Sequence, residues 1–129
     1  MPEAPVGAPK PNAIEAIFGR RRAVIGVVHL PPLPGAPRDE GRPVAETLKA
    51  ALADARSYAA GGVDGLIVEN HGDIPFAKPD ELGPETAAAM AVIADAVRRE
   101  TRLPIGINVL ANAPIQALAV ARASGALFI

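Results

Sequence analysis

Three polar residues of this chain, His29, Glu69 and Asn108, each stand at or near the end of a short apolar run. An imidazole, a carboxylate and a carboxamide can accept, donate and orient protons in general acid–base catalysis. In sheets built from β-α units, ligands bind at the carboxyl ends of the strands. The sequence therefore predicts that these three are candidate catalytic residues of one site.

The apolar runs are the predicted strands, at about 23–30, 65–69, 104–110 and 126–129. They are nearly continuous in apolar residues, which is typical of parallel strands covered on both faces. Patterns of helical spacing lie between them, so the chain alternates strand and helix throughout. Such alternation predicts a parallel sheet with right-handed crossovers, strands in the order 1-2-3-4 and helices packed on one face.

Two architectures fit this order of elements, an open doubly wound sheet and the first half of an eight-stranded barrel. No G-x-G-x-x-G motif follows the first strand, and the PPLPG segment at 31–35 lacks the amide donors of a pyrophosphate-binding loop. The fold class predicted is therefore α/β, a partial TIM (β/α)8 barrel with about four parallel strands and outer helices.

Strand side chains alternate between two faces. The β-branched Ile105 and Ile107 suit the helix layer, so Asn108 is expected to point away from the helices. The same alternation places His29 and Glu69 on that side. In a layered barrel, His29 and Asn108 would lie level, with Glu69 half a step off. A carboxylate in such a place is costly unless it is paired, hydrogen-bonded or bound to a metal.

The helices are expected to begin near Pro43, Pro84 and Pro114, since proline suits the first turn, and the first of them to end at Gly61 and Gly62. Their predicted inner faces are Val44, Leu48, Leu52, Ala55 and Ala59, then Met90, Ile93 and Val97, then Ile115, Leu118 and Ala119. A short additional helix is expected over 12–18, with Asn12 as its cap and Gly19 as its break. Residues 1–13 are otherwise interpreted as a flexible, proline-rich leader.

Three further residues, Asn70, Asp73 and Asn112, are candidate ligand-binding residues next to these strand ends. Each has a plainer interpretation. Asn70 and Asp73 belong to ENHGD, a composition typical of turns, and Asn112 suits a helix cap. His29 could equally be a structural histidine. His29, Glu69, His71 and Asp73 could together ligate a divalent cation. No ligand spacing is diagnostic, so no metal site is predicted and no cofactor is identified.

Composition excludes several classes of function. The 129 residues carry a net charge of −1, and only three phenylalanines and one tyrosine are aromatic, which argues against nucleic-acid binding. The absence of cysteine excludes disulfides and thiolate chemistry. The amino terminus lacks the apolar segment of a signal peptide. A cytoplasmic protein is expected, with attachment to the surface of a membrane as the alternative.

The chain also resembles a known family, the BtpA family, which includes SgcQ-like proteins. The matching stretches are VIGVVHLPPLPGAP (24–37), GGVDGLIVENHGDIPF (61–76), PETAAAMAVIADAVR (84–98), PIGINVLAN (104–112) and GALFI (125–129). The resemblance implies a barrel of the ribulose-phosphate-binding kind. It also implies a role in biogenesis or stabilisation of photosystem I reaction-centre proteins, within a membrane-associated protein complex. The alternative is a TIM-barrel enzyme or binding protein acting on a small phosphorylated metabolite.

Two departures from the family pattern affect these expectations. Where the family has a Leu-Arg-Asn-Asp segment, this chain has Leu110, Ala111, Asn112 and Ala113, without the basic and acidic positions. Family sequences also continue beyond GALFI, so residues 14–129 are expected to be the N-terminal half of such a barrel. Four strands would leave two open edges and an apolar inner face, which predicts self-association.

Overall fold

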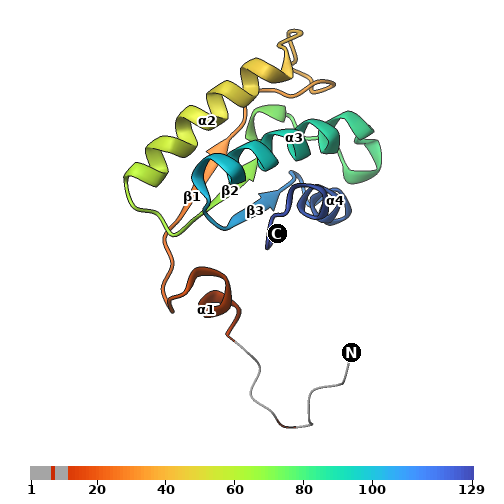
Figure 1. Cartoon of the computed structure of the whole chain (residues 1–129). Coiled ribbons are helices and arrows are strands. Elements are labelled where there is room, and N and C mark those ends of the chain that lie inside the picture. Colours follow the sequence, from red (N-terminus) through yellow and green to blue (C-terminus); the bar gives the residue numbers. More distant parts are fainter. Residues whose placement is uncertain (1–6, 8–11) are drawn as a thin grey trace.

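Strands and helices alternate along the chain, as the sequence predicts (Figure 1). The computed structural model describes residues 7 and 12–129. The elements are α1 (Ala13–Phe18), β1 (Ile25–His29), α2 (Val44–Ala60), β2 (Gly65–Glu69), α3 (Pro84–Thr101), β3 (Ile105–Asn108) and α4 (Pro114–Ser124), with short 3-10 turns η1 (His71–Asp73) and η2 (Pro79–Glu81). Most of the predicted leader, residues 1–13, lies outside the described residues.

The three strands form one parallel sheet in the order β1-β2-β3, which agrees with the predicted order. The prediction of a fourth strand at 126–129 is wrong, because this segment does not form a strand. Phe128 forms a single parallel bridge to Gly106, with Leu127 N donating to Ile105 O at 2.8 Å and Ile107 N donating to Phe128 O at 3.1 Å. The segment lies beside β3 as expected, but pairing through one residue is too short to make a strand.

Helices α2, α3 and α4 follow one another around the sheet, with α2 against α3 and α3 against α4 (Figure 1). The strand side chains that face them are fully buried. These are Val28, Leu66, Val68, Ile105 and Ile107, each at most 1% exposed. Met90, Ile93 and Val97 meet them from α3 at 0% exposure, as predicted. The hydrophobic core therefore lies between the sheet and the helices.

Helix α4 differs from its prediction at two points. Ile115 and Leu118, expected on its inner face, are 74% and 54% exposed, and Ala119, expected there too, is also exposed. Its buried residues are Ala117, Val120, Ala121 and Ser124. Small side chains on that face allow α4 to approach α3 closely, so the alanine-rich face packs inward. The residue that caps α4 is Ala113 rather than Asn112, which adopts a left-handed φ of 58°.

The opposite face of the sheet is covered at its amino end by two aromatic rings. Phe18, at the end of α1, lies over Gly65, and Phe128 lies over Gly106. The two rings meet edge to face, with centroids 5.5 Å apart. A side chain at either glycine would overlap its ring, so glycine is required at both positions. Ile25, Val27 and Ile67 on this face are half-buried rather than bare.

Candidate functional site

The structure brings the three candidate catalytic residues side by side. In the register of the sheet, His29 pairs with Glu69 and Glu69 pairs with Asn108. Asn108 Nδ2 donates a hydrogen bond to Glu69 Oε2 at 2.8 Å, and His29 Nε2 lies 3.5 Å from Glu69 Oε1. The expected half-step offset of Glu69 along a barrel axis stays a prediction, because the register describes only which residues are paired. The residues form one row across the carboxyl ends of the sheet.

Glu69 is the central and most enclosed member of this row. Its side chain is 14% exposed, whereas that of His29 is 55% exposed and Asn108 is also exposed. Each carboxylate oxygen has its own neighbour, an amide on one side and an imidazole on the other. Such an arrangement orients the carboxylate and places a second proton-transfer group beside it, which are the elements of general acid–base chemistry.

Asn70 and Asp73 lie behind this row and bond within the protein. Asn70 is 0% exposed; its Oδ1 accepts from Leu110 N at 2.7 Å, and its Nδ2 donates to Asp73 Oδ2 at 3.0 Å. Asp73 Oδ1 accepts from Leu33 N at 2.8 Å. These two side chains therefore join the segments that follow β1, β2 and β3. Their role as ligand-binding residues stays a prediction.

Burial sets the protonation behaviour of this network. Desolvation raises the pKa of the Asp73 carboxyl above its ordinary value, and the hydrogen bonds from Leu33 and Asn70 offset part of that rise. The carboxylate is thus retained at a cost in free energy, and its hydrogen bonds explain why a charged group is tolerated there.

Asn112 lies apart from the carboxylate row but shares a cavity with one of its members. Asn108 and Asn112 both line a cavity of about 170 Å³ beside β3, together with Pro114 and Ile129. Asn112 is exposed, so its amide is accessible from solvent. The structure therefore places this candidate ligand-binding residue next to the site, and its binding role stays a prediction.

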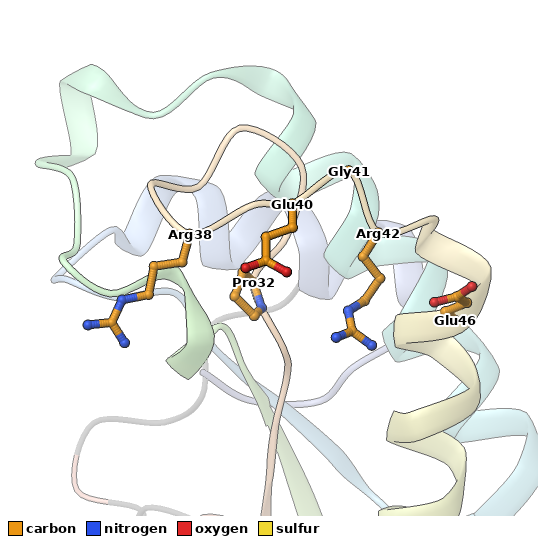
Figure 2. Close-up of a pocket in the computed structure, with 6 residues that line it drawn as sticks. All are labelled: Pro32, Arg38, Glu40, Gly41, Arg42 and Glu46. Atoms are coloured by element: carbon orange, nitrogen blue, oxygen red, sulfur yellow. The ribbon is translucent and has the colours of Figure 1, made fainter.

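A larger cavity of about 490 Å³ lies in the loop between β1 and α2. Figure 2 shows the side chains of Arg38, Glu40 and Arg42 pointing to the same side of this loop, with Pro32 between the arginines. Glu46, at the start of α2, lines the cavity too. Two arginines and two glutamates balance in charge, and none belongs to the hydrogen-bonded row, so we assign the candidate site to the strand ends.

His71, considered from the sequence only as a possible cation ligand, lies beside the site in a contact that the sequence did not predict. The ring of His71 stacks on that of His29, with centroids 4.4 Å apart and an interplanar angle of 19°. Its position in a turn-forming segment hid this contact, and the signal available was only that the chain has two histidines. In residues 7 and 12–129, no group of three or more histidine or acidic side chains is arranged to hold a metal ion.

The fold and the site define a parallel α/β protein with polar side chains gathered at adjacent strand ends. The BtpA family model matches residues 20–129, and the chain belongs to this family. This confirms the family expected from the motifs.

Individual relatives agree with that assignment. A protein of Archaeoglobus fulgidus named "Uncharacterized protein" is 50% identical over 84% of this chain and 42% of its own length. A Pyrococcus horikoshii protein is 46% identical over 84% of this chain and 40% of its own length. "Photosystem I biogenesis protein BtpA" of Synechocystis is 46% identical over 87% of this chain and 38% of its own length.

The chain spans about two-fifths of the length of these curated relatives. No solved structure gives a significant match to it. Among the described residues, none of the helices has both the length and the apolar character needed to cross a bilayer.

Proposed function

We propose that this chain forms part of a (β/α)8-type barrel whose mouth binds a small phosphorylated metabolite, as an enzyme or as a binding protein. The observation that carries this proposal is the row of His29, Glu69 and Asn108 across three adjacent parallel strands. Carboxyl ends of parallel strands are the ligand-binding end of such barrels. The phosphorylated class follows from the resemblance of the family to ribulose-phosphate-binding barrels.

In this proposal the three residues have different tasks. Glu69 is the general base, since its enclosed carboxylate can accept a proton from a bound hydroxyl or activated C–H group. Asn108 is a positioning residue that holds one carboxylate oxygen. His29, beside the other oxygen and more exposed, exchanges the proton with the ligand or with water.

Calorimetric titration of the chain with a panel of sugar phosphates tests this site. We expect Glu69→Gln to weaken binding of the preferred sugar phosphate at least about tenfold, because the carboxylate that accepts hydrogen bonds from the sugar hydroxyls is lost. Glu100→Gln is the matched control, since Glu100 lies on α3 and pairs with Arg56. Arg42→Gln tests the cavity in the loop after β1. If the affinity for the sugar phosphate is unchanged in Glu69→Gln but lost in Arg42→Gln, the binding site lies in that loop and not at the strand ends.

A second candidate function rests on the name of the Synechocystis relative, "Photosystem I biogenesis protein BtpA". In this alternative the protein acts in the cytoplasm, at the surface of a membrane, within a protein complex. Expression of the protein in a Synechocystis strain that lacks its own relative tests the idea. Recovery of photosystem I content would support it, and normal expression without recovery would count against it.

We also propose that two copies of the chain bind each other. Val24 at the β1 side is 65% exposed, and Leu127 and Ile129 at the β3 side are 61% and 54% exposed. Two copies related by a two-fold axis could cover each other's open edges. Sedimentation of the purified chain is expected to give a dimer, and a cooperatively unfolding monomer would refute this.

A further inference from the structure

The two histidines of the chain lie in contact, although they are far apart in the sequence. His29 ends β1, and His71 begins the short turn η1 after β2. Their rings are nearly parallel, with an interplanar angle of 19°. His29 belongs to the row with Glu69 described above, whereas His71 has no assigned role.

The position of His71 is fixed by the turn that carries it. Gly72 N donates to Leu30 O at 2.9 Å, which ties the turn to the end of β1. A Cβ atom at Gly72 would lie 2.5 Å from Leu30 O, so the close approach requires glycine. On the other side, Asp73 accepts from Leu33 N at 2.8 Å. The backbone on both sides of the contact is thus held in place, and the stacking does not depend on a loose loop.

We propose that His29 and His71 together bind an oxyanion, the phosphate group of a small phosphate ester, which deepens the site proposed above and rests on it. Histidine N–H donors lie in the plane of the ring, so the donors of the two stacked rings lie in nearly parallel planes whose rings are 4.4 Å apart. One phosphate group has several oxygens and can accept from both. The nitrogen lone pairs of parallel rings do not converge, which disfavours a metal ion between them.

The charges around the pair make this binding dependent on protons. Glu69 faces His29 from β2 at 3.5 Å, and Asp54 of α2 lines a cavity with His29. Asn108 from β3 is neutral, and Asp73 from η1 is turned inward toward Leu33 and Asn70. With neutral rings, His29, His71 and Glu69 together carry a net charge of −1. Both rings must be protonated before these three groups become net positive and attract an anion.

Nuclear magnetic resonance of the imidazole groups, recorded while inorganic phosphate is added to the full chain, tests the pair directly. Two histidines give two sets of signals, so each is followed separately. We expect both to shift with the same dissociation constant. Shifts in His29 alone, or in neither ring, would overturn the proposal.

Substitutions give a second readout. His71→Gln is expected to weaken phosphate binding about tenfold, because one charged donor is lost. Arg42→Gln, in the separate cavity after β1, is the control and should leave phosphate binding unchanged. Amide spectra confirm that each variant is folded. Phosphate binding that survives His71→Gln and disappears in Arg42→Gln would overturn the proposal.

Ligand choice separates a phosphate ester from other sources of the same signal. Glycerol 3-phosphate should bind at least as tightly as inorganic phosphate, and glycerol should not shift either imidazole. If Zn²⁺ shifts the signals of both imidazoles and phosphate shifts neither, the pair is a metal site and not an oxyanion site. Suppose that His71→Gln weakens phosphate binding but Glu69→Gln does not weaken sugar-phosphate binding. That result would support the histidine pair and refute the acid–base site. If Glu69→Gln weakens sugar-phosphate binding but His71→Gln does not weaken phosphate binding, only the histidine pair is refuted.

Discussion

The two faces of the three-stranded sheet differ in what they contribute. On the helix side, Leu66 and Val68 are completely buried in the core between the sheet and the helices. On the other side, the neighbouring residues Ile67 and Glu69 are only partly buried, and along β2 this face passes from Gly65 through Ile67 to Glu69. The contrast teaches that one face supplies most of the stability, so the other is free to hold costly polar groups at the strand ends.

The largest effect is expected from Leu66→Ala, which leaves a cavity between sheet and helices. We expect a loss of about 2–5 kcal/mol in the free energy of unfolding. Ile67→Ala, one residue further along the same strand, should cost about 1 kcal/mol because its side chain is half-buried. Urea unfolding followed by circular dichroism measures both. Equal losses would mean that the two faces do not differ in stability.

A smaller effect, of about 1–3 kcal/mol, is expected from Gly106→Ala. The new methyl group would overlap the ring of Phe128 on the face opposite the helices. Adding Phe128→Ala should restore part of the lost stability, because it removes the overlapping ring. Thermal unfolding of both single variants and the double variant measures the coupling. Strictly additive losses would show that the ring does not lie over Gly106.

The raised pKa of Asp73 implies that the free energy of unfolding depends on pH. Its pKa is raised in the folded chain, so the folded state holds this proton to higher pH than the unfolded state does. Its contribution to stability therefore falls as pH rises above the ordinary value of 3.8, by about 1.4 kcal/mol for each unit of pKa elevation. Urea unfolding of the wild type and Asp73→Asn across this range isolates the contribution. A wild type that becomes more stable relative to Asp73→Asn as pH rises would contradict it.

The smallest effect on stability is expected from Glu69→Gln. Glutamine keeps the size of this side chain and can still accept from Asn108 Nδ2, so the free energy of unfolding should change by less than about 1 kcal/mol. Glu100→Gln on α3 should behave alike. The same urea unfolding measures both. A loss comparable with that of Leu66→Ala would make Glu69 a structural residue rather than a functional one.

Much of this contrast is predictable from the sequence, because it depends on alternation. The period of two along β3 correctly places Ile105 and Ile107 against the helices and Asn108 opposite them. The strand order follows from short connections between successive units. Met90 and Ile93 are correctly predicted as core residues, since their spacing leaves α3 only one strongly apolar face.

Helix α4 shows where periodicity is insufficient. Apolar and alanine residues occur on several of its faces, so more than one inward orientation satisfies the pattern. Close approach to α3 favours the face with Ala117 and Ala121, which leaves Ile115 and Leu118 exposed. The choice depends on the shape of the neighbouring helix, which the spacing within α4 does not encode.

The contacts behind the site are unpredictable for a related reason. The alternation brings His29, Glu69 and Asn108 to one edge, but the paths of the loops decide what else arrives there. Asp73 reaches Leu33 N only because η1 folds back over the end of β1. Neither this bond nor the stacking of His71 has a signature in local composition, since the same residue types serve ordinary turns.

The contact between Phe18 and Phe128 has a kinetic consequence. It joins residues near opposite ends of the described chain, so the loop it closes carries a large entropic cost unless the strands between them are already paired. We therefore expect the contact to form after the folding transition state. Truncating the Phe18 ring would speed unfolding and leave the rate of folding almost unchanged.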